Sequence, residues 1–201
     1  MQSLPDEITL EITSYLSLPS LCSLYKTCRR YRLLCSDNQV WTNLFNQEGL
    51  PILDKGYNFI FWLVLYRKAL VSKKVTRDLL ASYKEQEDYP FLIDPVPFSL
   101  PIYDVVATGK AVMMADPLRK DILEQGVEKG LYLVLSKKGK DFYYFLVTFD
   151  TDLNKSLEEN QKILVERTIE ESIMFDIIYR LSYYGLYVAI ANLSPTPIRL
   201  F

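Results

Sequence analysis

The chain has 201 residues, 49% of them hydrophobic, with 23 Lys and Arg against 25 Asp and Glu and no histidine. This length can bury an ordinary hydrophobic core, in one domain or in one domain plus a small module. The near balance of charge favours neither nucleic acid nor a membrane surface as a partner. The missing histidine removes the commonest general base and the commonest metal ligand, so we expect no enzyme, no metal and no cofactor.

The three cysteines, Cys22, Cys28 and Cys35, lie at helical intervals in one short stretch and form no Cys-x-x-Cys pair. An odd number argues against a disulfide framework, so we expect free thiols in a reducing compartment. The first seven residues carry two acids and no cationic segment, which is unlike a signal peptide. The longest apolar run, residues 59–66, is too short to span a bilayer. We therefore expect a cytoplasmic or nuclear protein.

The N-terminal stretch predicts a series of short helices. The first has Pro5 in its first turn, where a missing N–H costs nothing, and Ser3 is its expected cap. Its apolar residues recur at helical spacing and form one stripe, namely Leu4, Ile8, Ile12, Tyr15 and Leu16. Residues 18–20 begin a second helix with an apolar side made of Leu21, Leu24, Tyr25 and Cys28. A third helix is expected at residues 29–35, and residues 36–38 cap a short helix that carries Val40, Trp41, Leu44 and Phe45.

The middle of the chain predicts a helical connection. Residues 57–83 are typical of a long apolar helix or helix pair, buried between layers in its early part because it is apolar almost all round. Residues 55–84 carry seven cations and one anion. The four prolines between residues 86 and 101 forbid regular helix and predict a stiff extended linker or an ordered surface strap.

The last part of the chain predicts an α+β domain with a mainly antiparallel sheet. Strands are expected at residues 102–107, 131–136, 141–149, 162–169 and 186–192, and the turn at 137–140 predicts a hairpin. Helices are expected from Asp116-Pro117 to near Gly126 or Gly130, and from Ile169 to Gly185. We find no internal repeat, which excludes propellers and leucine-rich or ankyrin arrays.

Five elements follow one another in the N-terminal stretch: a Leu-Pro-x-Glu start, an apolar stripe, a Leu-Cys pair, a Cys-Arg-x-aromatic step and an Asp-x-x-x-Trp end. They stand at residues 4–7, at Ile8, Ile12 and Leu16, and at residues 21–22, 28–31 and 37–41. In this order and spacing, residues 3–45 resemble the F-box. Two residues depart from the family pattern: Tyr31 replaces the usual tryptophan and Thr27 the usual valine. Tyr31 keeps the aromatic bulk but adds a hydroxyl that needs a partner.

The resemblance implies that this module binds the Skp adaptor, which links F-box proteins to a cullin–RING ubiquitin ligase. A module of some forty residues cannot bury all its apolar groups, so part of its surface is left for a partner. On the family pattern the adaptor contacts are Leu4, Pro5, Ile8, Leu16, Leu21, Leu24 and Cys28. Ile12, Tyr31 and Trp41 are expected to pack the module and its junction. The alternative is that all of these residues are the core of an ordinary helical subdomain.

Three parts of the chain are therefore expected: an adaptor-binding module at residues 1–48, a helical connection at 49–88 and an α+β domain at 89–201 that recruits a target protein. The expected function is the substrate-recognition subunit of an SCF-type (Skp–cullin–F-box) ubiquitin ligase, without catalysis by this chain. One alternative is a non-degradative scaffold or a decoy that occupies the adaptor. Another is an enzyme of unknown type in the C-terminal domain.

Other candidate sites are weaker. Cations beside aromatic residues in 57–84 suit single-stranded nucleic acid, but adjacent apolar residues cannot all face solvent, which favours a buried helix with a solvated basic flank. Residues 150–154 begin like a calcium loop, but Lys155 and Gln161 stand where that loop needs glycine and glutamate. The acid pairs at 158–159 and 170–171 are typical of a solvated helix face.

Tyrosines are abundant in the C-terminal part, namely Tyr143, Tyr144, Tyr183, Tyr184 and Tyr187. Neighbours on a strand point to opposite faces, so some of these side chains should be exposed. Tyrosine is a favoured contact residue at interfaces, but it is also ordinary half-buried sheet material, and we favour the second interpretation.

Overall fold

A computed structural model describes residues 4–85, 99–101, 113–125, 131–138, 140–149 and 161–185. The chain divides into two compact units, Met1–Lys73 and Lys74–Phe201, and the division lies within one long helix. The predicted cap Ser3, most of the proline-rich stretch and the predicted strands at 102–107 and 186–192 lie outside the described residues. The three-part division of the chain stays a prediction.

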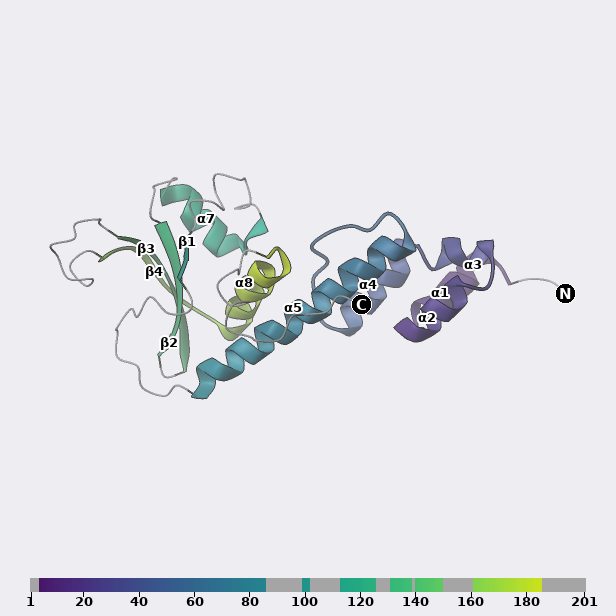
Figure 1. Cartoon of the computed structure of the whole chain (residues 1–201), viewed down its shortest axis with the longest axis horizontal. Coiled ribbons are helices and arrows are strands. Elements are labelled where there is room, and N and C mark those ends of the chain that lie inside the picture. Colours follow the sequence, from purple (N-terminus) through teal and green to yellow (C-terminus); the bar gives the residue numbers. More distant parts are fainter. Residues whose placement is uncertain are drawn as a thin grey trace. The chain divides into compact units, whose positions relative to one another are not determined.

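The N-terminal unit is helical (Figure 1). Its elements are α1 (Asp6–Ser14), α2 (Leu18–Tyr25), α3 (Arg29–Leu34), α4 (Asn38–Gln47) and the first half of α5 (Phe59–Glu85). The first helix packs against both α3 and α4, and α2 packs against α3. Helices this short are marginal in isolation, so their stability comes from packing against one another.

Local signals in the sequence set several of these helix ends. The Asp37 carboxylate accepts a hydrogen bond of 2.8 Å from the backbone N–H of Gln39 and so caps α4. Pro19 lies in the first turn of α2, where its missing N–H has no partner to lose. After α4 the chain leaves the helix at Gly49, which has a φ of 65°, in the region that glycine enters without strain.

An aromatic cluster forms the core of the N-terminal unit. The ring of Trp41 on α4 stacks on Trp62 of α5 with 5.9 Å between centroids, and Phe59 and Tyr66 meet Trp41 edge-on. The indole N–H of Trp41 donates a 2.9 Å hydrogen bond to the carbonyl of Cys35, so this fully buried ring leaves no polar atom unpaired. The cluster fixes α4 against the first half of α5.

The C-terminal unit contains a four-stranded antiparallel sheet in the order β1-β2-β3-β4. Its strands are β1 (Ser99–Pro101), β2 (Leu131–Lys138), β3 (Asp141–Phe149) and β4 (Gln161–Ile169). Its helices are α7 (Asp116–Gln125), α8 (Glu171–Tyr183) and the second half of α5. Strands β2 and β3 pair antiparallel up to Lys138 and Asp141, as the predicted hairpin requires. The pairing of β3 with β4 shifts register between Leu146 and Val147, which indicates a β-bulge.

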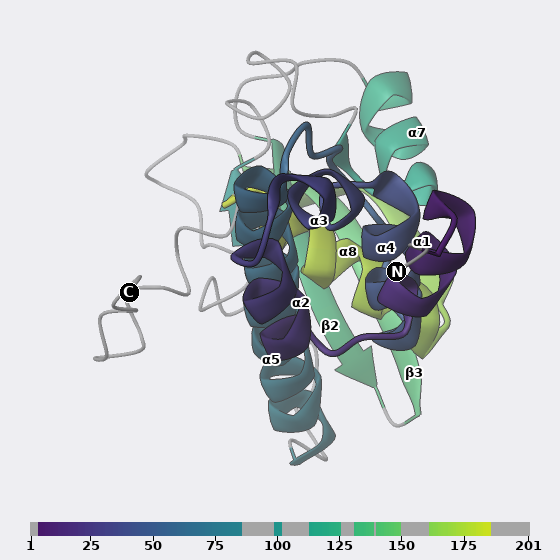
Figure 2. The same ribbon diagram turned by 90° about the vertical axis from the view of Figure 1, so that its right-hand side faces the viewer.

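Helices α7 and α8 lie on the same side of the sheet (Figures 1 and 2). Alternate residues of β2 and β3, among them Leu133, Tyr144 and Leu146, bury their side chains there against both helices. On the other face Phe145 and Val147 are buried too. The unit is therefore α+β with apolar residues buried on both faces of its sheet, which confirms the expected fold class.

Candidate docking surface

The first helix exposes an apolar stripe. Its members Leu4, Ile8 and Ile12 are 57%, 46% and 53% exposed, and Tyr15 extends the stripe beyond the end of the helix. These residues follow one another at intervals of four, four and three, which places them on one side of a helix. A contiguous apolar stripe in water, unlike a scattered apolar residue, is typical of an interaction surface.

The opposite, buried side of α1 carries hydroxyl groups. Thr9, Thr13 and Ser14 are buried, and each hydroxyl donates to a nearby backbone carbonyl of the same segment; the Thr13 Oγ1 lies 2.7 Å from the carbonyl oxygen of Thr9. Their hydrogen bonds are thus satisfied locally, so these residues can be buried at little cost. The helix turns a polar face to the unit and an apolar face to water, the reverse of an ordinary surface helix.

An arginine from α3 holds the segment that precedes α1. The Arg30 Nε donates a 2.7 Å hydrogen bond to the Asp6 carboxylate, and its Nη2 donates to the carbonyl of Leu4. These charge-assisted contacts join residues that are 24 and 26 positions apart in the chain. They fix Leu4 in line with the first turn of the helix, so the stripe is one turn longer than α1 itself.

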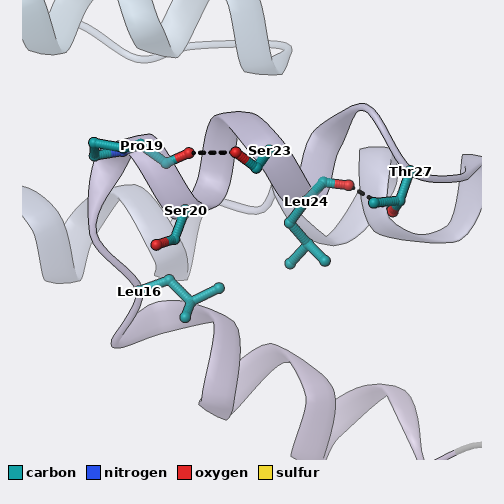
Figure 3. A pocket seen from close by; sticks show the side chains of 6 residues that line it. All are labelled: Leu16, Pro19, Ser20, Ser23, Leu24 and Thr27. Carbon is teal, nitrogen blue, oxygen red and sulfur yellow. Dashed lines mark hydrogen bonds between the residues drawn. The ribbon is translucent and has the colours of Figure 1, made fainter.

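An open hollow of about 490 Å³ lies where the chain passes from α1 into α2 (Figure 3). The side chains of Leu16 and Leu24 point toward one another in the space between the two helices. The rest of the hollow is lined by Pro19, Ser20, Ser23 and Thr27, and the hydroxyls of Ser23 and Thr27 donate to backbone carbonyls. The hollow therefore offers aliphatic contacts beside hydroxyls that already have partners.

A family model described as F-box-like matches residues 1–47, the segment that holds the stripe, the Arg30 contacts and the hollow. Residues 1–47 are an F-box-like domain. The match covers under a quarter of the chain, and no solved structure matches the chain.

Curated relatives match over the same part of the chain. An F-box protein of Saccharomyces cerevisiae is 37% identical over 60 residues, which cover 25% of this chain and 9% of that protein. The probable E3 ubiquitin ligase complex SCF subunit sconB is 35% identical over 65 residues in Neosartorya fischeri and 36% identical over 63 residues in Aspergillus niger. Those segments cover 27% and 26% of this chain and 9% of each relative. The likeness therefore concerns the F-box-like domain and not the remainder of the chain.

Most of the residues expected to contact an adaptor are accessible in the F-box-like domain. Leu4, Pro5, Ile8 and Cys28 are exposed, and Leu16 and Leu24 are partly exposed at the hollow. Leu21 is a correction, because it is fully buried. It faces inward on α2, where its carbonyl lies 3.9 Å from the buried Cys35 thiol, so it supports the surface from beneath. That the exposed residues contact an adaptor stays a prediction.

The expected core of the F-box-like domain needs a second correction. Trp41 is fully buried, as expected, and Tyr31 is partly buried, but Ile12 is 53% exposed. Ile12 lies on the same side of α1 as Ile8, while the side that faces α3 and α4 is taken by threonine. Ile12 thus belongs to the stripe. Tyr15, which completes the stripe three residues later, was not expected at the site although its spacing already indicated it.

The cysteines of the F-box-like domain are free and differ in environment. Burial raises the pKa of the Cys35 thiol to about 11. Cys28 is exposed just before α3, and hydrogen bonding from the backbone N–H of Tyr31 lowers the pKa of its thiol. Cys28 is the cysteine that a reagent or a partner can reach in its more reactive form.

The C-terminal unit holds one buried polar network among its described residues that joins two strands to a helix. The Asp121 carboxylate on α7 accepts two hydrogen bonds of 2.7 Å from Arg167 on β4 and one of 2.6 Å from the Tyr144 hydroxyl on β3. Hydrogen bonding from Arg167 lowers the pKa of Asp121, and burial raises the pKa of Tyr144. Every member has its partner, so the network fastens α7 to the sheet.

The C-terminal tyrosines and the calcium-like stretch form no binding site among the described residues. Tyr144 and Tyr183 are buried and Tyr143 and Tyr184 are partly buried, whereas Tyr187 lies outside the described residues. The calcium-like stretch also lies outside them, except Gln161, the first residue of β4. Within the described parts of the chain, no group of three or more acids or cysteines could hold a metal ion. No helix there is long and apolar enough to cross a bilayer.

Proposed function

We propose that the chain docks a Skp-family adaptor through the apolar stripe of α1 and the hollow beside it. The observation that carries this proposal is the reversed orientation of α1, with Ile8 and Ile12 in water and Thr9 and Thr13 buried. Full burial of an aliphatic side chain contributes about 1.5–3 kcal/mol. The stripe and the hollow therefore hold enough unused apolar surface for a specific complex, and the F-box-like match supports a Skp-family adaptor as the partner.

We further infer that the chain is the substrate-recognition subunit of an SCF-type ubiquitin ligase. The relatives named as SCF subunits support this role. The adaptor links the chain to a cullin–RING ligase, and the C-terminal unit holds the target. The chain then acts by proximity, because simultaneous binding raises the local concentration of the target's lysines near the ligase. This role requires no chemistry by the chain itself, and it places the chain in the cytoplasm or nucleus, in agreement with three free cysteines.

The first experiment is a pulldown of a purified Skp-family adaptor with the full chain and its variants. Ile8→Asp places a charge on the stripe. The double variant Leu4→Ala with Pro5→Ala removes the apolar side chains at the start of the stripe. Leu123→Asp is the matched control, because Leu123 on α7 is also an exposed apolar residue, 58% exposed against 46% for Ile8. We expect Ile8→Asp to weaken adaptor binding at least about tenfold, while the control binds like the wild type. Adaptor binding that survives both stripe changes would remove the docking proposal.

The ligase role is tested separately. Cullin should coprecipitate with the chain only when adaptor is present. The Ile8→Asp variant should not coprecipitate cullin even with adaptor present. A target captured by the C-terminal unit should accumulate when the proteasome is inhibited. Two results would instead indicate a scaffold or a decoy that occupies the adaptor. One is adaptor binding without coprecipitation of cullin, and the other is a captured target whose turnover is unchanged by proteasome inhibition.

A further inference from the structure

The first half of α5 exposes a second apolar stripe, which shares no residue with the docking surface described above. Ile60, Val64 and Val71 are 56%, 55% and 42% exposed. They stand at intervals of four and seven residues, so they lie on one side of the helix over about 17 Å. The sequence predicted that this part of the helix would be buried between layers, with a solvated basic flank. The structure buries the opposite side, with Phe59, Trp62 and Tyr66, and leaves the apolar residues of this side in water.

Cations accompany this stripe. Arg67 and Lys68 are exposed between Val64 and Val71, on the same side of the helix. Asp54 already opposes the charge of Lys68. Arg67 belongs to none of the ion pairs found among the described residues. The face is therefore apolar along its length and positive at its middle, and its natural complement is an apolar surface that carries acids near its middle.

The same contacts argue against two other occupants. Single-stranded nucleic acid would need several free aromatic rings to stack on, but Phe59, Trp62 and Tyr66 are buried in the core of the unit. The exposed ring of Tyr57 already stacks on the partly buried ring of Phe61, which leaves the stripe without a row of free rings. A second copy of the chain, packed face to face, would bring two Arg67 side chains together at the centre of the contact. Like charges so placed cost free energy unless each has a partner, and the stripe itself offers none.

We propose that this face of α5, made of Ile60, Val64, Arg67, Lys68 and Val71, docks an acidic amphipathic segment of another protein. The aliphatic side chains of that segment cover the stripe, and its carboxylates pair with Arg67 near the middle of the face. Affinity comes mainly from the buried apolar area, whereas the charge sets the orientation and selects acidic over basic segments.

The test uses two labelled synthetic peptides of about 18 residues, long enough to form several helical turns. Both carry leucines at helical spacing; one has flanking glutamates and the other has lysines at the same positions. Fluorescence anisotropy measures their binding to the full chain. We expect the wild type to bind the glutamate peptide and Val64→Asp to weaken that binding at least about tenfold. Arg67→Glu should weaken it similarly and should gain affinity for the lysine peptide.

Leu123→Asp is again the control for an exposed apolar residue. Every variant is also tested for adaptor binding, which should be unchanged, so a failure here is separable from a failure of adaptor docking. Wild-type chain that binds neither peptide, or both equally well, would overturn the proposal. So would concentration-dependent self-association that Val64→Asp abolishes, or retention of a single-stranded oligonucleotide that Arg67→Glu abolishes.

Discussion

Arg30 on α3 and Asp6 in the first turn of α1 form an ion pair with 2.7 Å between nitrogen and oxygen, and the same guanidinium holds the carbonyl of Leu4. Asp6 also lies at the positive end of its helix, which a carboxylate stabilises. One side chain thereby connects the Cys-Arg-Arg-Tyr step of the F-box-like domain to the start of its exposed stripe. The contact is at the surface, so its value lies in positioning more than in stability.

Loss of Arg30 should therefore weaken docking more than folding. We expect Arg30→Ala to lower the free energy of unfolding by less than about 1 kcal/mol and to weaken adaptor binding severalfold, because Leu4 is no longer held in line with the stripe. Arg29→Ala, at the neighbouring exposed arginine, is the control and should bind like the wild type. Titration calorimetry against the adaptor and thermal unfolding measure the two effects. Equal losses for both variants would show that only net charge matters.

Substitutions at Ile12 and Trp41 should distinguish an effect on adaptor binding from an effect on folding. Trp41→Ala removes a fully buried ring and should destabilise the N-terminal unit by about 3–5 kcal/mol. Ile12→Ala changes an exposed side chain and should cost less than about 0.5 kcal/mol, yet weaken adaptor binding. The chain has two tryptophans, Trp41 and Trp62, both in the N-terminal unit, so indole fluorescence reports denaturant unfolding of that unit. A large loss of stability in Ile12→Ala would show that Ile12 belongs to the core and not to the stripe.

The Asp121 network predicts a loss of stability in acid. The pKa of Asp121 is lowered in the folded chain, so the unfolded chain binds more protons as the pH falls below about 4. The stabilisation that ionised Asp121 contributes is complete above the pKa of this residue in the unfolded chain. It is lost as the pH falls through the lower pKa that Asp121 has in the folded chain. We expect Asp121→Asn to cost about 1–3 kcal/mol near neutral pH and to make the C-terminal unit less sensitive to acid.

Hydrogen exchange of the β3 and β4 amides over a pH series is the measurement for this network. Asp116→Asn is the matched control, because Asp116 is an exposed acid on the same helix with a surface contact to Arg119. Its exchange and pH profile should follow the wild type. An unchanged profile for Asp121→Asn would mean that Arg167, whose side chain is half exposed, pairs with water just as well.

The cysteines should react in a fixed order. With iodoacetamide in mildly alkaline buffer, Cys28 should be alkylated well before Cys35, because the Cys28 thiol is exposed with a lowered pKa and Cys35 is buried with its pKa raised to about 11. A bulky maleimide on Cys28 should also block adaptor binding, whereas Cys28→Ser treated in the same way should still bind. Mass spectrometry of the digested chain gives the order. Full binding by the labelled wild type would remove Cys28 from the docking surface.

Elements with strong local signals were predictable from the sequence. Asp37 marks the start of α4, Asp116-Pro117 the start of α7, and Gly185, with a φ of 65°, follows the end of α8. The Lys-Gly-Lys turn likewise predicted the hairpin of β2 and β3. Each of these signals acts within a few residues, through a cap, a fixed φ or a turn, so no knowledge of the remainder of the fold is needed.

The orientation of α1 was harder to predict. Periodicity correctly placed Ile8 and Ile12 on one side of a helix, but period alone does not say which side faces the unit. Burial of Thr9 and Thr13 depends on their hydrogen bonds to carbonyls four residues earlier and on packing against α3 and α4. For the same reason the stripe of α5 and the network around Asp121 had no sequence signal, since both result from contacts between distant segments.

The exposed apolar face of α1 should also determine when chaperones and proteases act on the chain. Chaperones and proteases recognise failed folding by apolar surface in water, and a correctly folded N-terminal unit presents that feature along α1 until a partner covers it. We therefore expect chaperones and proteases to act on newly made copies even in their native state. We expect the cellular abundance of the chain to follow the supply of its docking partner, with surplus copies removed soon after synthesis.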